Sequence, residues 1–120
     1  MPKTNALILD AREALEYNTS HIENAVFVGY DSFKIDTAKR MFPNKEEKIV
    51  VYCSVGIRSE KIAKQLKKAG YTNVYNLYGG IFQWKNNGFK IFDTEEKETE
   101  NVHVSSKYWA KFLLKGNKVY

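Results

Sequence analysis

The sequence has few residues of the kinds that build disulfides, metal sites or membrane spans. It contains one cysteine, Cys53, which excludes an internal disulfide and a zinc site made from several cysteines. Its two histidines, His21 and His103, lack the spacing of a metal motif, so we expect no metal and no cofactor. No apolar run reaches the length of a transmembrane helix, and no signal-peptide pattern is present. We therefore expect a cytoplasmic protein with no membrane partner.

The composition is that of a small folded domain with a modest positive charge. The 120 residues fit one domain, and 43% hydrophobic residues are enough for a buried core. Lysine and arginine number 19 against 14 aspartate and glutamate, which gives a net charge of +5. This charge favours a small anionic substrate or an acidic partner. It comes without a nucleic-acid-binding motif, so we predict no nucleic-acid partner.

Short apolar runs alternate with helical patterns along the chain. The run Ile49–Tyr52 is continuous and rich in β-branched residues, as is typical of a strand that is covered on both faces. Strands that alternate with helices predict an α/β fold of three layers, with a mainly parallel central sheet flanked by helices. We expect strands at Ala6–Leu9, Val26–Val28, Ile49–Tyr52 and Val74–Leu77, and helices at Arg12–Tyr17, Ser32–Met41, Ser59–Ala69 and from Gly79 to near Gly88.

The composition changes after Phe92. Residues 93–100 hold five acidic residues and one lysine, which indicates a solvated linker between a domain at 1–92 and an extension at 101–120. The extension has the pattern of a strand at Val102–Val104 followed by a helix. Ser105 or Ser106 would cap that helix, which would bear Tyr108, Trp109, Phe112 and Leu113 and end at Gly116. We predict that the extension packs on the domain through Trp109 and Phe112.

Cys53 lies in the loop between the Ile49–Tyr52 strand and the Ser59–Ala69 helix. Parallel sheets bind ligands beyond the carboxyl ends of their strands, so this loop is the candidate site. Backbone N–H groups in such a turn form an anion-binding nest, and a helix N-terminus adds partial positive charge. Arg58 adds a full charge, which we interpret as attracting substrate. The loop residues are Cys53, Ser54, Val55, Gly56, Ile57, Arg58 and Ser59.

This cradle predicts sulfur chemistry at Cys53. The thiolate is the reactive form of cysteine, and the cradle would stabilise it as well as the anionic outer sulfur of a persulfide. The thiolate would take sulfur from a small anionic donor such as thiosulfate. A thiol, a cyanide-like nucleophile or a protein would then accept that sulfur, which completes covalent catalysis in two half-reactions.

Four motifs in order resemble the rhodanese (sulfurtransferase) family over roughly Ala6 to Ile91. Beside the cysteine loop they are Asp10-Ala11-Arg12, Ser20-His21-Ile22, and Val74 to Ile81 with its Gly79-Gly80 turn. The resemblance implies a rhodanese-like fold with Cys53 as the nucleophile and Ser54–Ser59 as the loop that binds substrate and persulfide. It also implies that Asp10, Arg12 and His21 are structural residues near the site.

Two other functions fit parts of the sequence, and the sequence differs from the family pattern at one place. Related phosphatases have a loop one residue longer than the six residues from Cys53 to Arg58, so the shorter loop favours sulfur transfer over phosphate ester hydrolysis. A persulfide carrier or partner-docking domain without its own turnover would have the same loop. The family usually has a strand and a helix ahead of its Asp-x-Arg strand, whereas five residues precede Ala6 here. The strand and helix expected at 101–120 are a candidate for that place.

Overall fold

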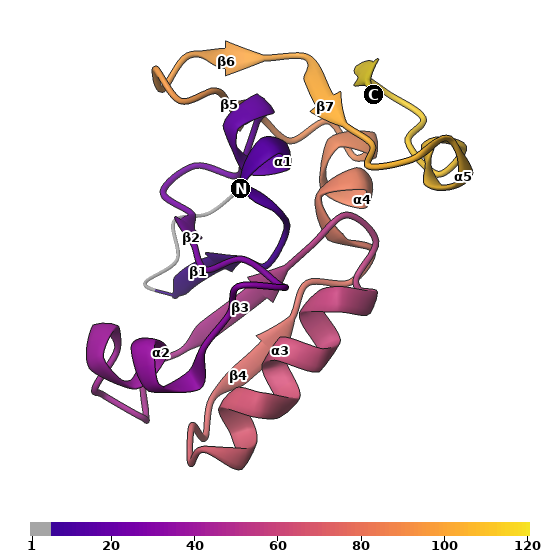
Figure 1. The fold of residues 1–120 in the computed structure, drawn as a ribbon. Coiled ribbons are helices and arrows are strands. Elements are labelled where there is room, and N and C mark those ends of the chain that lie inside the picture. The colour runs from indigo at the N-terminus through magenta and orange to yellow at the C-terminus, as the bar shows by residue number, and fades with distance from the viewer. Residues whose placement is uncertain (1–5) are drawn as a thin grey trace.

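The computed structural model describes residues 6–120, and its main sheet consists of four parallel strands in the order β2-β1-β3-β4 (Figure 1). This confirms the predicted α/β class with a central parallel sheet flanked by helices. The elements are β1 Leu7–Asp10, α1 Ala14–Thr19, β2 Val26–Phe27, α2 Ile35–Met41, β3 Ile49–Tyr52, α3 Ile57–Lys68, β4 Val74–Asn76, α4 Gly80–Asn86, β5 Ile91–Phe92, β6 Glu98–Thr99, β7 Asn101–His103, α5 Lys107–Ala110 and β8 Asn117–Val119.

The two faces of the sheet belong to separate hydrophobic clusters. Successive strand side chains point to opposite faces, and in β3 Val51 packs with α2 and α3 whereas Tyr52 packs with α4. Ile62 and Leu66 of α3 are fully buried in the first cluster, and the lysines of that helix are exposed. Burial on both faces explains why β3 has a continuous apolar sequence. No helix in the described part of the chain is long and apolar enough to cross a membrane.

The acidic segment at 93–100 is mostly exposed, and it also forms part of a hairpin. β6 pairs antiparallel with β5, so that Phe92 lies opposite Glu98. Phe92 also exchanges two backbone hydrogen bonds with His21, at 2.8 and 2.9 Å, which attach the hairpin to the domain. The charge pattern of this segment did not reveal its strand because a two-residue strand is too short to show an alternation.

The C-terminal segment, which we define as residues 101–120, packs on the second cluster. Its buried apolar residues are Val102, Val104, Ala110 and Leu113. Of the two side chains expected to anchor the segment, Trp109 is partly buried against the cluster, whereas Phe112 is 46% exposed. β7 pairs with β8 rather than with the main sheet, so the segment does not supply a strand to that sheet.

The expected helix in this segment is only four residues long, from Lys107 to Ala110. The side chain of Asn86 accepts hydrogen bonds from the backbone N–H groups of Leu114 and Lys115, at 2.7 and 3.1 Å. These contacts hold the backbone between the end of α5 at Ala110 and the start of β8 at Asn117. A partner on α4 that binds the chain at this point has no signature in the local sequence.

Candidate active site

Cys53 lies immediately after β3, at the carboxyl edge of the parallel sheet. Its side chain is buried, with 1% exposure, and it lines a pocket of about 270 Å³. The pocket is also lined by Ser54, Val55, Ile57, Arg58, Ser105 and Trp109. The lining therefore combines the loop after β3 with two residues of the C-terminal segment.

Within residues 6–120, two groups lie within hydrogen-bonding distance of the Cys53 sulfur. The backbone N–H of Gly56 donates to Sγ at 3.0 Å, and Gly56 has a positive φ of 110°, which a residue with a side chain resists. The Ser59 hydroxyl lies 3.4 Å from Sγ and 2.6 Å from Oδ1 of Asn76. A hydroxyl has one proton, and we assign it to the shorter contact, with Asn76. The sequence predicts an anion-binding nest of several backbone N–H groups. Within residues 6–120, one backbone N–H, that of Gly56, donates to the sulfur.

The residues that follow the Gly79-Gly80 turn bind the backbone of the cysteine loop. The backbone N–H groups of Ile81 and Phe82 donate to the carbonyl oxygens of Cys53 and Ser54, at 2.9 and 3.1 Å. A Cβ atom on Gly80 would lie 2.4 Å from the Cys53 oxygen and 2.5 Å from the Ser54 oxygen. The first turn of α4 approaches the loop this closely only because Gly80 has no side chain.

Arg58 lies at the same pocket, but its charge is shared with an acid. Its guanidinium donates to both carboxylate oxygens of Glu16 at 2.8 Å, and to Ser54 Oγ at 3.0 Å. Burial would lower the pKa of Arg58, but the hydrogen bonds and charge of Glu16 outweigh burial and raise it. Arg58 is therefore a fixed cation within an ion pair, and its field at the pocket mouth is weaker than that of a free arginine.

Glu16 is a site residue that the sequence analysis missed. Its carboxylate also accepts hydrogen bonds from Ser54 Oγ at 3.1 Å, from the Glu13 N–H at 2.8 Å and from the Ser105 hydroxyl. Burial alone would raise the pKa of Glu16, but the bonds from Arg58 and Ser105 lower it from 4.5 to about 2. The capping-box position on α1 was a visible signal, whereas the pairing with Arg58, 42 residues away, was not.

Ser105 reaches Glu16 from the C-terminal segment through an unusual backbone conformation. It has a positive φ of 67°, and its N–H donates to Nδ1 of His103 at 3.0 Å. The imidazole thus holds the backbone so that the Ser105 hydroxyl meets the carboxylate. One buried acid therefore connects α1, the cysteine loop and the C-terminal segment.

Asp10 and Arg12 form a buried ion pair that joins the ends of neighbouring elements. The Arg12 guanidinium donates to Asp10 at 2.7 Å and to the Ser20 carbonyl at 2.6 Å. The Tyr52 hydroxyl donates to the same carboxylate at 2.6 Å. Burial and the Asp10 charge raise the pKa of Tyr52, so this hydroxyl remains protonated. None of these side chains hydrogen-bonds to the sulfur, and their contacts fix the strand end from which the site loop begins.

His21 likewise contacts its own neighbourhood rather than the sulfur. Its ring stacks on Tyr17 with centroids 4.0 Å apart, and its Nδ1 lies 2.9 Å from the Tyr17 carbonyl oxygen. The structure thus brings together the loop Cys53–Ser59 and leaves Asp10, Arg12 and His21 in a supporting network.

The parallel sheet has one buried cysteine in a short loop at its carboxyl edge. This arrangement is typical of α/β proteins that use a cysteine nucleophile. The model of the rhodanese-like domain family matches residues 1–87, and the chain belongs to this family. Several strains of Escherichia coli have a tRNA uridine(34) hydroxylase that is 37% identical over 83 residues, which are 67% of this chain and 24% of that protein. The chain thus spans about a quarter of the length of the curated relatives it matches.

Solved structures show the same fold. The thiosulfate sulfurtransferase of Pseudomonas aeruginosa is 27% identical with a TM-score of 0.66, covering 74% of this chain and 17% of that one. A rhodanese-like domain from Anabaena sp. is 25% identical with a TM-score of 0.68, covering 79% of this chain and 70% of that one. These likenesses support chemistry of the sulfurtransferase family for this chain.

Proposed function

We propose that this protein is a sulfurtransferase that carries a sulfane sulfur as a persulfide on Cys53. The observation that carries the proposal is the position of the sulfur atom. It lies at the carboxyl edge of the sheet, receives the Gly56 N–H at 3.0 Å and lines a pocket of about 270 Å³. A pocket of this size accommodates thiosulfate, and a second sulfur bonded to Sγ would extend into it.

The reaction has two half-reactions that balance in atoms and charge. In the first, the Cys53 thiolate attacks the outer sulfur of thiosulfate, the bond between its two sulfur atoms breaks, and sulfite leaves with the electron pair. In the second, a nucleophile attacks the outer sulfur of the persulfide, and the electron pair of the broken bond returns to Cys53. The Gly56 N–H stabilises negative charge on Sγ at the start and at the end. Arg58, whose charge is partly balanced by Glu16, lines the same pocket near the outer sulfur.

The direct test is the formation of thiocyanate from thiosulfate and cyanide. We expect turnover by the unaltered chain and none by the Cys53→Ser variant, because the hydroxyl does not form a persulfide. The Ser106→Ala variant is the matched control, since that exposed serine is outside the pocket lining. Equal thiocyanate formation by Cys53→Ser and by the unaltered chain would refute the proposal.

A second candidate is a persulfide carrier that a protein partner loads. The ion pair between Arg58 and Glu16 favours this candidate, because it leaves less positive charge for attracting free thiosulfate. The two candidates differ in the source of sulfur. Persulfide formation with free thiosulfate supports the enzyme, whereas formation only with a persulfide-bearing protein donor supports the carrier.

The names of the curated relatives raise a further activity. They are tRNA uridine(34) hydroxylases, and 24% of their length matches this chain. Incubation of the chain with tRNA, followed by digestion and mass spectrometry of the nucleosides, tests this activity. Our proposal predicts no new hydroxylated uridine, and its appearance would replace sulfur transfer as the assigned activity.

A further inference from the structure

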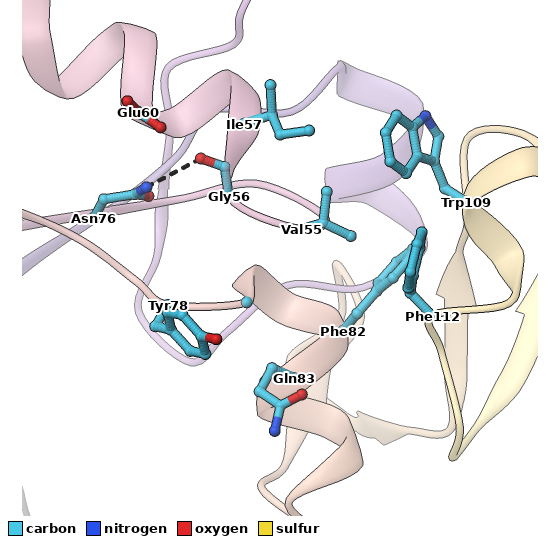
Figure 2. Close-up of a pocket in the computed structure, with 11 residues that line it drawn as sticks. Val55, Gly56, Ile57, Glu60, Asn76, Tyr78, Phe82, Gln83, Trp109 and Phe112 are labelled. Carbon is cyan, nitrogen blue, oxygen red and sulfur yellow. Dashed lines mark hydrogen bonds between the residues drawn. The ribbon is translucent and has the colours of Figure 1, made fainter.

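A second pocket lies beside the one that contains Cys53. It has a volume of about 520 Å³ and shares three lining residues with the smaller pocket, namely Val55, Ile57 and Trp109. Figure 2 shows Val55 and Trp109 facing the same space, with Phe112 next to them. Shared walls make the two pockets neighbours, so a molecule in the larger one is close to the outer sulfur of a Cys53 persulfide.

The lining of the larger pocket is mostly apolar and aromatic. Phe82 comes from α4, and Trp109 and Phe112 come from the C-terminal segment (Figure 2). Glu60 is its one charged lining residue within residues 6–120. The remaining lining residues are Val55, Gly56, Ile57, Asn76, Tyr78, Gly79 and Gln83.

The two pockets differ in the charge they accept. The smaller pocket includes the Arg58 guanidinium, which suits an anionic sulfur donor. The larger pocket has no cationic lining residue among the described residues, and the Glu60 carboxylate at its edge repels anions. Thiosulfate therefore belongs in the smaller pocket, and an uncharged apolar group belongs in the larger one.

The volume of the larger pocket fits a small organic molecule. Ligand pockets in proteins have volumes of about 300 to 1,000 Å³ and are lined by apolar side chains with a few polar groups. Two amides supply polar groups here. That of Asn76 is already bonded to the Gly56 carbonyl at 3.0 Å and to Ser59, whereas that of Gln83 has one long contact, at 3.5 Å, with Asn87. Gln83 thus remains available to orient a ligand.

We propose that the larger pocket binds the uncharged apolar body of an organic thiol, which is the sulfur acceptor. This inference rests on the proposed persulfide chemistry and names its acceptor. With its body in the larger pocket, the acceptor places its thiolate past Val55, Ile57 and Trp109 into the smaller pocket, where the thiolate attacks the outer sulfur. The persulfide bond breaks, its electron pair returns to Cys53, and the acceptor leaves as an organic persulfide. The C-terminal segment thereby selects the acceptor through Trp109 and Phe112.

Phe112 is the residue that separates this role from general catalysis. It lines the larger pocket but not the smaller one, and its 46% exposure allows its removal without opening the core. The experiment compares the Phe112→Ala variant with the Leu114→Ala variant, because Leu114 belongs to the same segment, is 78% exposed and lines neither pocket. Each protein is loaded with thiosulfate, and its unloading by phenylmethanethiol or by cyanide is followed by intact mass spectrometry in a single turnover.

We expect Phe112→Ala to slow unloading by phenylmethanethiol about tenfold, the equivalent of an aromatic contact of about 1.4 kcal/mol. Unloading by cyanide, and loading by thiosulfate, should match the unaltered chain because neither molecule needs the larger pocket. Leu114→Ala should leave all three rates unchanged. Equal rates with phenylmethanethiol for Phe112→Ala and the unaltered chain, or an equal slowing with both acceptors, would overturn the inference.

A binding measurement separates failure of this inference from failure of the proposed function. Equilibrium dialysis of phenylmethanethiol against Cys53→Ser reports occupation of the pocket without any chemistry. Binding that weakens about tenfold in the Cys53→Ser, Phe112→Ala double variant supports the pocket even if no persulfide forms. Absence of persulfide with intact binding would refute the proposed function alone, whereas persulfide transfer to cyanide without binding of the thiol would refute this inference alone.

Discussion

The close approach of Gly80 to the cysteine loop gives a prediction that can be worked out from the structure. A Cβ atom at this position would lie 2.4 to 2.6 Å from three backbone atoms of Cys53 and Ser54, whereas ordinary contacts begin at 3.4 Å. The Gly80→Ala variant must therefore displace the loop backbone by about 1 Å, at a cost of about 2 kcal/mol. Its positive φ of 62° adds about 1 kcal/mol for a residue with a side chain.

The Gly88→Ala variant is the matched control. Gly88 also has a positive φ, of 86°, but a Cβ atom there would contact nothing within 4 Å. Gly88→Ala should therefore lose about 1 kcal/mol of stability in urea unfolding and keep its sulfurtransferase activity. Gly80→Ala should lose about 3 kcal/mol, and its thiocyanate formation should fall about a hundredfold, because a 1 Å shift of a reacting group has this effect. Equal activity of the two variants would refute the argument that Gly80 allows the loop its position.

Three further changes test other parts of the structure. The pKa of Glu16 falls from 4.5 to about 2 on folding, so the chain should lose about 3 kcal/mol of stability between these pH values, and Glu16→Gln should lack this acid-dependent loss in urea unfolding. Tyr52→Phe removes the hydroxyl that donates a hydrogen bond to Asp10 and accepts one from the Ile22 N–H. This variant should lower the free energy of unfolding by about 2 kcal/mol. An unchanged free energy of unfolding would contradict this network. Deletion of residues 101–120 removes four buried apolar side chains and should lower the melting temperature, and an unchanged melt would show that the segment does not stabilise the domain.

Much of the fold was predictable because its signals are local. The sequence of β3 is apolar and β-branched at consecutive positions, and the predicted bounds Ile49–Tyr52 are those of the structure. The helix after the loop begins two residues earlier than predicted, at Ile57, directly after Gly56, whose backbone is left-handed. Strand pairing was also predictable in kind, since short strands separated by helices pair in parallel.

The features that escaped prediction depend on contacts between distant residues. The ion pair of Arg58 with Glu16 joins residues 42 positions apart, and the link of Glu16 to Ser105 joins residues 89 positions apart. Sequence alone left Arg58 as a free cation for substrate, whereas its partner is an acid on α1. The same holds for Asn86 of α4, which binds the backbone between α5 and β8. No local pattern encodes these pairings, because each depends on how the elements pack.

The central claim is that Cys53 carries a sulfane sulfur, and intact mass spectrometry after thiosulfate treatment tests it most directly. We predict that the chain gains the mass of one sulfur atom, that a reductant removes this gain, and that Cys53→Ser shows none. A chain whose mass stays unchanged, or a Cys53→Ser variant that gains the same sulfur, would contradict the account.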